Sequence, residues 1–141
     1  MDPGSWRRAF GTPEYGVKAS SPFSLGIRVG GDCDLIFTAG LTARDKSGQI
    51  VAPGDIKGQT RQVFHLLKSL LAEEGAELRD VVRLGFFLRD ITEMQEVYGI
   101  RRELWPVDPP ASTTVEVSRL VTDDVRIEIE AVAAVPHRRA S

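Results

Sequence analysis

The stretch Val125-Arg126-Ile127-Glu128-Ile129-Glu130-Ala131-Val132-Ala133-Ala134 alternates with a period of two. This alternation is typical of a β-strand, in which successive side chains point to opposite faces. One face carries the apolar residues Val125, Ile127, Ile129, Ala131 and Ala133, and the other carries Arg126, Glu128 and Glu130. Neighbouring carboxylates on one face of a strand lie roughly 6–7 Å apart. We therefore expect this strand to build a core with one face and to present acid groups on the other.

The acid groups of this strand have two interpretations. Asp and Glu are mostly exposed in proteins, so Glu128 and Glu130 can simply form a solvated strand face. Alternatively, Glu128 lies in a cleft where desolvation raises its pKa and it handles protons. The alternation alone does not distinguish the two, so the choice depends on the rest of the chain.

Size and composition bound the class of protein. A length of 141 residues predicts one domain with a real core, and a formal net charge of −2 argues against binding to nucleic acid. A single cysteine excludes a disulfide within the chain, and no CxxC, HExxH or DxDxDG pattern suggests a metal site. No apolar run is long enough to span a membrane and no leader is evident, so we expect a cytoplasmic protein.

Outward from the alternating stretch, turn and cap residues delimit the other elements. Gly30-Gly31-Asp32 is a hairpin signal, Asp55 and Gly75 are cap residues for a helix, and Thr92 with Gln95 forms a capping-box pattern. The expected elements are an irregular arm over 1–20, a hairpin of strands over 24–29 and 34–39, a helix from Asp55 to Gly75, a strand over 80–88, a helix from Thr92 to Trp105, a strand over 111–117, the alternating strand, and a short tail over 136–141.

Both predicted helices are amphipathic. The second has an apolar stripe formed by Met94, Val97, Tyr98, Ile100, Leu104 and Trp105. Arg101, Arg102 and Glu103 are interpreted as lying off this stripe, in solvent. His65 in the first helix is interpreted as a surface or packing histidine, because no partner acid is near it in the sequence.

The order of elements predicts an α+β fold. Strands with hairpins at both ends and two intervening helices indicate one mixed sheet covered on one face by the two helices. In so small a domain, the apolar residues of the other sheet face are commonly covered by a partner subunit.

Several stretches, in their order and spacing, resemble the YjgF/YER057c/UK114 family, also called the reactive intermediate deaminase (RidA) family. The resemblance extends over about 21–135, which we treat as the domain that follows the arm. The stretches are Asp55-Ile56-Lys57-Gly58-Gln59-Thr60-Arg61-Gln62, Leu67-Lys68, Gly75-Ala76-Glu77-Leu78-Arg79-Asp80-Val81-Val82, Val115-Glu116-Val117-Ser118-Arg119-Leu120 and Ile127-Glu128-Ile129-Glu130-Ala131-Val132-Ala133.

The resemblance implies a chorismate-mutase-like (YjgF-like) α+β fold and a homotrimer with a ligand cleft at each subunit interface. It also implies hydrolysis of small-molecule 2-imino or 2-enamino acids to 2-keto acids and ammonia, without a metal or organic cofactor. In the family an arginine holds the substrate carboxylate and a glutamate positions the attacking water. A planar fork of donors suits a carboxylate, and a placed acid shuttles protons.

This sequence has the family's glutamate but lacks the arginine that binds the substrate carboxylate, which we call the clamp. Glu128 matches the glutamate, whereas Ser112 stands where the family's Pro-Ala-Arg-Ser-Cys-Val-Glu-Val stretch has its arginine. The other positions that match the family's cleft are Phe23 for a tyrosine, Ala39 for a serine, Gly40, Tyr98 for an asparagine and Thr114 for a cysteine. Together with Phe86 or Phe87, these residues make the cleft more apolar than the family's cleft. Such a cleft suits a larger, less anionic ligand.

Two functions follow from these substitutions. The first is an enzyme that uses Glu128 as general acid/base on an imine, enamine or related carbonyl compound, by hydrolysis, tautomerisation or condensation, but is poor on small 2-imino acids. Such an enzyme could be dedicated to one pathway, for instance in specialised metabolite biosynthesis. The second is a non-catalytic ligand-binding or regulatory trimer. A ribonuclease, as some family members have been described, is the weakest interpretation, because the chain has an acidic balance and no His pair for cleavage of RNA. Classical imine hydrolysis survives only if another cation, such as Arg28, Arg44 or Arg126, replaces the clamp.

Overall fold

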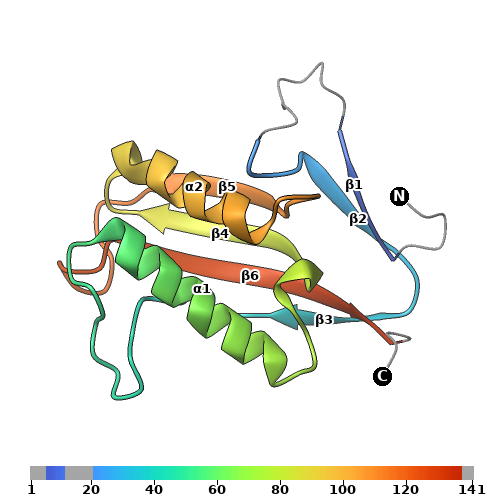
Figure 1. Ribbon diagram of the computed structural model, residues 1–141, viewed down its shortest axis with the longest axis horizontal. Helices are drawn as coiled ribbons and strands as arrows, with labels where there is room; N and C mark the ends of the chain where they lie inside the picture. The colour runs from blue at the N-terminus through green and yellow to red at the C-terminus, as the bar shows by residue number, and fades with distance from the viewer. Residues whose placement is uncertain (1–5, 12–20, 138–141) are drawn as a thin grey trace.

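Six strands and two α-helices form the described part of the chain, residues 6–11 and 21–137, in a computed structural model (Figure 1). Short 3₁₀ turns, Leu78–Asp80 and Ile91–Glu93, precede β4 and α2. The elements are β1 (Arg7–Phe10), β2 (Gly26–Val29), β3 (Cys33–Phe37), α1 (Ile56–Ala72), β4 (Val81–Leu88), α2 (Met94–Leu104), β5 (Ala111–Glu116) and β6 (Ile127–Pro136).

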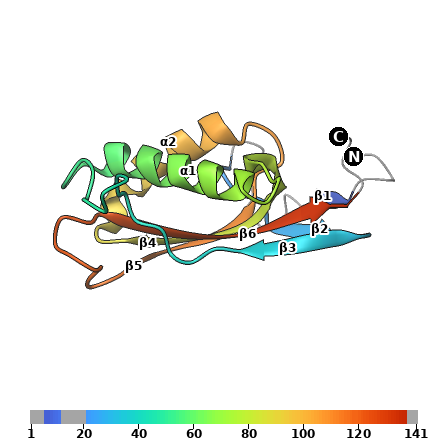
Figure 2. The same ribbon diagram turned by 90° about the horizontal axis from the view of Figure 1, so that it is seen from below.

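The main sheet has four strands in the order β3-β6-β4-β5. The alternating stretch forms β6, which lies inside the sheet and pairs antiparallel with both β3 and β4, while β4 and β5 are parallel. Both helices lie on one face of this sheet, and none of the described residues forms a helix on the other face (Figure 2). The prediction of a mixed α+β sheet covered by two helices is therefore confirmed.

The core lies between the sheet and α1. The apolar face of β6 is buried as its alternation predicts, and α1 turns Val63, Phe64, Leu67 and Leu71 toward it. The Phe64 ring packs edge-on against Phe86 of β4 and Trp105 after α2, with ring centroids 6.2 and 5.4 Å apart. These aromatic contacts join both helices and the sheet into one core.

The strand pairings differ from the prediction at both ends of the chain. Segments 24–29 and 34–39 do not form a hairpin, because β2 pairs with β1 in a separate two-stranded ribbon and β3 pairs with β6. β5 and β6 do not form a hairpin either, because β4 lies between them. In each case the strand pairs with a partner that is not its nearest neighbour in the chain.

The N-terminal arm was expected to be irregular, and part of it is not. Residues 7–10 form β1, paired antiparallel with β2, and the buried Arg7 donates a hydrogen bond from Nη2 to the Val81 carbonyl at 3.3 Å. The remainder of the arm, 1–5 and 12–20, lies outside the described residues, as does the end of the tail, 138–141.

The helix ends follow the predicted caps in part. α1 ends at Ala72 with Glu73 as its C-cap, two residues before the expected cap Gly75. Gly75 follows with φ +70°, which favours glycine, and the next N–H, of Ala76, returns to the Leu71 carbonyl. Asp55 stands at the N-cap of α1, but its side chain makes no capping hydrogen bond. Before α2 the capping acceptor is Asp90, whose Oδ1 takes the Thr92 backbone N–H at 3.0 Å, so the predicted Thr92–Gln95 capping box is wrong.

Gly99 in the middle of α2 offers a simple stability test. It is exposed, and a Cβ built there would meet nothing within 4 Å. Gly99→Ala should therefore stabilise the protein by about 0.5–1 kcal/mol, since alanine loses less backbone entropy in a helix than glycine does. Urea unfolding monitored by circular dichroism measures the change, and an unchanged or lower midpoint would contradict it.

His137 joins the end of β6 to the turn before β3. Its Nδ1 lies 3.0 Å from Asp32 Oδ1, and its Nε2 lies 2.6 Å from Asp34 Oδ1. The hydrogen bonds to Asp34 and then Asp32 raise the pKa of His137. A raised pKa means that the contact stabilises the fold fully below the unfolded histidine pKa of about 6.5 and loses this effect as the pH rises through the folded value.

Asp34→Asn should therefore lower the pKa of His137 and weaken the pH dependence of stability in that window. NMR titration of the imidazole C–H signals measures the pKa, and melting temperatures on either side of the window measure the stability. Asp123→Asn, in an exposed turn, is the matched control. The same His137 pKa in both variants would show that Asp34 does not hold the imidazolium.

The helix-free face of the main sheet carries exposed apolar side chains. Leu35, Phe37 and Val115 are 55%, 71% and 40% exposed there. A hollow of about 410 Å³ opens over Gly85, beside Arg83, Glu130 and Val132. Its cover by a partner subunit stays a prediction. No helix in the described ranges is long and apolar enough to cross a membrane.

Candidate active site

Glu128 and Gly40 lie together at the helix-free face of the main sheet. The chain after β3 continues beside β6, where Leu41 and Ile129 exchange backbone hydrogen bonds of 2.7 and 3.0 Å. This pairing places Gly40 against the Glu128 side chain so closely that a Cβ on Gly40 would lie 2.3 Å from Oε2. Glu128 is half-buried, while Ala39 and Gly40 are exposed. The carboxylate therefore lies against the backbone at Gly40 and is reachable from outside.

Ser112 and Thr114 belong to the opposite face of the same sheet. In the parallel register of β4 and β5, Ser112 is paired with Leu84 and Thr114 with Phe86. Leu84 and Phe86 are fully buried beneath the helices, so the two β5 side chains face α2. Glu128 is paired with Phe87, the neighbour of Phe86 that faces the other way. One sheet thus separates the predicted acid from the predicted clamp position.

Arg101 of α2 occupies the space next to Ser112. Its Nη2 donates a hydrogen bond to Ser112 Oγ at 2.8 Å, and its Cζ lies 4.5 Å from the centre of the Phe86 ring and 5.5 Å from that of Tyr98. The side chain is 0% exposed. Burial lowers the pKa of Arg101 to about 10, and Tyr98 opposes this shift while the cation of Arg102 adds to it.

The prediction that Arg101 is in solvent is therefore wrong, whereas Arg102 and Glu103 are exposed as expected. The spacing contained the correct signal. Arg101 comes seven residues after Met94 and four after Val97, so it shares their helix face. Its charge led to the wrong interpretation, because arginine is rarely buried.

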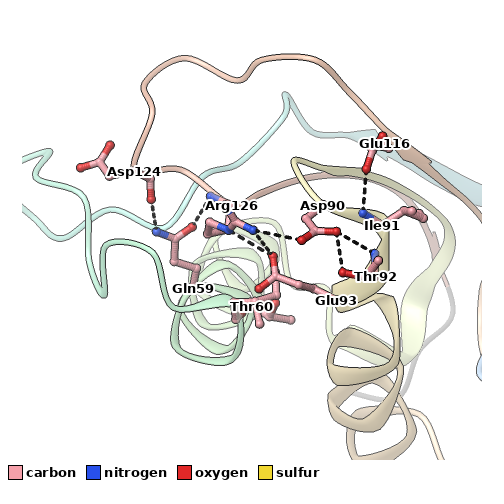
Figure 3. A network of polar contacts seen from close by, with 10 residues as sticks. Gln59, Thr60, Asp90, Ile91, Thr92, Glu93, Glu116, Asp124 and Arg126 are labelled. Atoms are coloured by element: carbon pink, nitrogen blue, oxygen red, sulfur yellow. Dashed lines mark hydrogen bonds and ion pairs between the residues drawn. The ribbon is translucent and has the colours of Figure 1, made fainter.

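Of the three other arginines considered as replacements, two are held by the protein. Arg126 donates to Glu93 Oε1 from Nη2 at 2.5 Å and lies 3.8 Å from Asp90 (Figure 3). Arg44 donates to the Thr42 hydroxyl and the Gly48 carbonyl. Arg28 is exposed on β2, opposite Arg8 of β1.

The Arg126 cluster is a structural junction. Buried Gln59 accepts the Arg126 backbone N–H at 2.7 Å and donates to the Asp124 carbonyl at 2.7 Å, while Glu116 accepts the Ile91 N–H at 3.1 Å (Figure 3). These bonds join the start of β6 to both helices. Arg126 therefore serves the fold here.

Phe23 lies in a third place. It lines a hollow of about 580 Å³ between the β1–β2 ribbon and the segment after α2, together with Trp105 and Pro109. Ser24 next to it bridges to Ala111 at the start of β5, and its N–H donates to the Pro110 carbonyl at 3.2 Å. Phe23 thus lies near the start of β5, which carries Ser112, but not beside Glu128.

Apart from Phe23, the predicted site residues form two groups in one chain. Glu128, Ala39 and Gly40 make an acid group on the helix-free face, and Tyr98, Ser112 and Thr114 surround Arg101 on the helix-covered face. Within 6–11 and 21–137 no set of three His, Cys, Asp or Glu side chains is placed to hold a metal ion. The chemistry available is acid–base catalysis on one side and anion binding on the other.

Comparisons with known proteins agree on one family. The family model described as Endoribonuclease L-PSP matches residues 15–135. A RutC family protein of Pyrococcus abyssi is 38% identical over 120 residues, covering 85% of this chain and 91% of the relative. The 3-aminoacrylate deaminase RutC of Acinetobacter baylyi is 33% identical over 102 residues, covering 72% and 80%.

A crystal structure is also similar. YyfB from Yersinia pestis, a protein of unknown function of the conserved Rid family, superimposes with a TM-score of 0.84 at 27% identity, covering 93% of this chain and 100% of that one.

Proposed function

Because this chain belongs to the Endoribonuclease L-PSP family, which is the YjgF/RidA family of the sequence resemblance, we propose that it hydrolyses an imine or enamine with Glu128 as the general acid/base. The observation that carries the proposal is the Glu128 carboxylate, which lies against the exposed Gly40 on the helix-free face of the sheet. Hydrolysis of a C=N bond needs one group that takes a proton from water and returns it to the leaving nitrogen. A single placed carboxylate meets that need without a cofactor.

The proposed site is completed by a second copy of the chain. Glu128 and the Ser112 cluster lie on opposite faces of one sheet, so a single protomer cannot present both to one small ligand. The exposed Leu35, Phe37 and Val115 on the Glu128 face give a neighbouring subunit an apolar surface to cover. A homotrimer with clefts between subunits satisfies both requirements.

The matching family model is described as an endoribonuclease, but the site gives that activity little support. Acid–base cleavage of RNA is typically performed by paired groups near the scissile phosphate. His65 is exposed on α1, and His137 is bound by Asp32 and Asp34 at the β3–β6 end. The net charge of −2 adds no attraction for phosphate.

The proposal is tested with imines generated in situ by an amino-acid oxidase, for example 2-iminopropionate, and with an uncharged imine. Ammonia release is compared with and without the protein, and light scattering gives the oligomeric state. Acceleration above the uncatalysed rate by a trimer is the expected result. No acceleration on any imine or enamine would favour the alternative of a non-catalytic ligand-binding trimer.

A further inference from the structure

Arg101 is a buried cation without a carboxylate partner. In the parts of the chain that the structure describes, no Asp or Glu pairs with its guanidinium, and no acceptor takes a hydrogen bond from Nε or Nη1. Burying an unpaired charge is unfavourable, and unsatisfied donors add to the cost. Stacking on Phe86 and Tyr98 offsets part of this cost.

The donors that remain have the geometry of an anion site. A guanidinium presents a planar fork that binds a carboxylate through two parallel N–H bonds. In Arg101 only Nη2 is used, and its acceptor is the neutral hydroxyl of Ser112. The two rings hold the plane of the fork, so little side-chain entropy is lost when an anion binds.

Two neighbours of this fork, Ser112 and Tyr98, reach the surface. Arg101 itself is fully buried, and both of these neighbours are partly exposed. For an anion to bind, the small Ser112 side chain must turn away from Nη2, so that one carboxylate oxygen takes the place of its hydroxyl and the second oxygen takes an idle N–H. Thr114, paired with Phe86 beside the ring, adds a hydroxyl on the same face of β5.

We propose that Arg101 binds the carboxylate of the substrate, so that this chain acts on imines or enamines of carboxylic acids. The inference rests on the proposed function and makes it narrower. It replaces the expectation from Ser112 alone that the ligand is uncharged. Arg101 is then a specificity-determining residue supplied by α2 rather than by β5.

The wild-type protein provides the first test, with stable product analogues in place of the reactive imine. 2-Oxobutanoate and its amide, 2-oxobutanamide, differ in the charge of one group. Calorimetry and thermal shift should show binding of 2-oxobutanoate and at least about 10-fold weaker binding of the amide, which lacks the charge-assisted bonds. Equal binding of both, or binding of neither, would overturn the inference.

Variants at position 101 provide the second test. Arg101→Met should weaken 2-oxobutanoate binding by about 10- to 150-fold. Arg101→Lys, which keeps the charge but not the fork, should be intermediate. Lys68→Met, on the exposed face of α1, is the control for loss of one positive charge and should bind as the wild type does.

Melting temperature separates a ligand role from a structural one. Replacing a buried, unpaired cation with an apolar side chain of similar length should leave the melting temperature of Arg101→Met unchanged or higher. Unaltered 2-oxobutanoate binding by a folded Arg101→Met would overturn the inference. If this variant unfolds, the comparison of acid and amide in the wild type decides.

The two proposals fail separately. If imine hydrolysis requires Glu128 but is equally fast for charged and uncharged imines, the role of Arg101 is wrong and the proposed enzymatic function stands. Arg101-dependent binding of 2-oxobutanoate without hydrolysis would keep the carboxylate site and remove the enzyme.

Discussion

Glu128→Gln should slow imine hydrolysis by about 10²- to 10⁴-fold, because the amide keeps the shape of the side chain but cannot take up and return a proton. The half-buried carboxylate against Gly40 has space for an amide of the same size, so the fold and assembly should persist. Ammonia release from 2-iminopropionate at equal concentrations of folded protein measures the effect.

Glu130→Gln is the matched control for this experiment. Glu130 is on the same strand and the same face, is exposed, and lies beside Gly85 instead of Gly40. Its substitution should change the rate little. A rate for Glu128→Gln within a few-fold of the wild-type rate, or an equal fall in both variants, would remove Glu128 from the proposed mechanism.

Gly40→Ala should lower activity almost as far as loss of the acid itself. A Cβ on Gly40 would lie 2.3 Å from Oε2 and 2.8 Å from Cδ of Glu128, so the carboxylate must move. A misplacement of about 1 Å in a reacting group can cost about 10²-fold in rate. We expect the loss in kcat, with the binding of 2-oxobutanoate largely retained.

Gly30→Ala is the control for adding a methyl group to the backbone near β3. A Cβ at Gly30 meets nothing within 4 Å, and Gly30 has no positive φ, so activity and stability should stay near wild-type values. Full activity in Gly40→Ala would mean that the carboxylate has freedom the structure does not show. A crystal structure of the variant would then give its new position.

The sequence predicts the elements of this fold better than their pairing. The alternation of β6 and the helical spacing of α1 are local patterns, and both appear in the structure where they were expected. Pairing depends on contacts between segments that are distant in the sequence. Nothing near Gly30-Gly31-Asp32 reveals that β1 takes β2 and that β6 takes β3.

The candidate site shows the same limit. Local patterns in the sequence predict that Tyr98 lies on α2 and Ser112 on β5. The place of Arg101 depended on weighing helical spacing against charge, and only a structure shows the rings and hydroxyl that hold it. The separation of Glu128 from Ser112 follows from the register of three strands, which no single stretch encodes.

The sheet separates the Glu128 carboxylate from the Arg101 guanidinium, so residues on one face can be substituted independently of those on the other. On the proposed function, substitutions on the α2–β5 side would alter what is bound, while the proton chemistry on the β6 side would stay intact. The binding cation would then be free to move from β5 to α2 without disturbing the acid. For protein engineering, the helix-covered face is the place to vary ligand preference, and the Gly40–Glu128 pair is the part to leave unchanged.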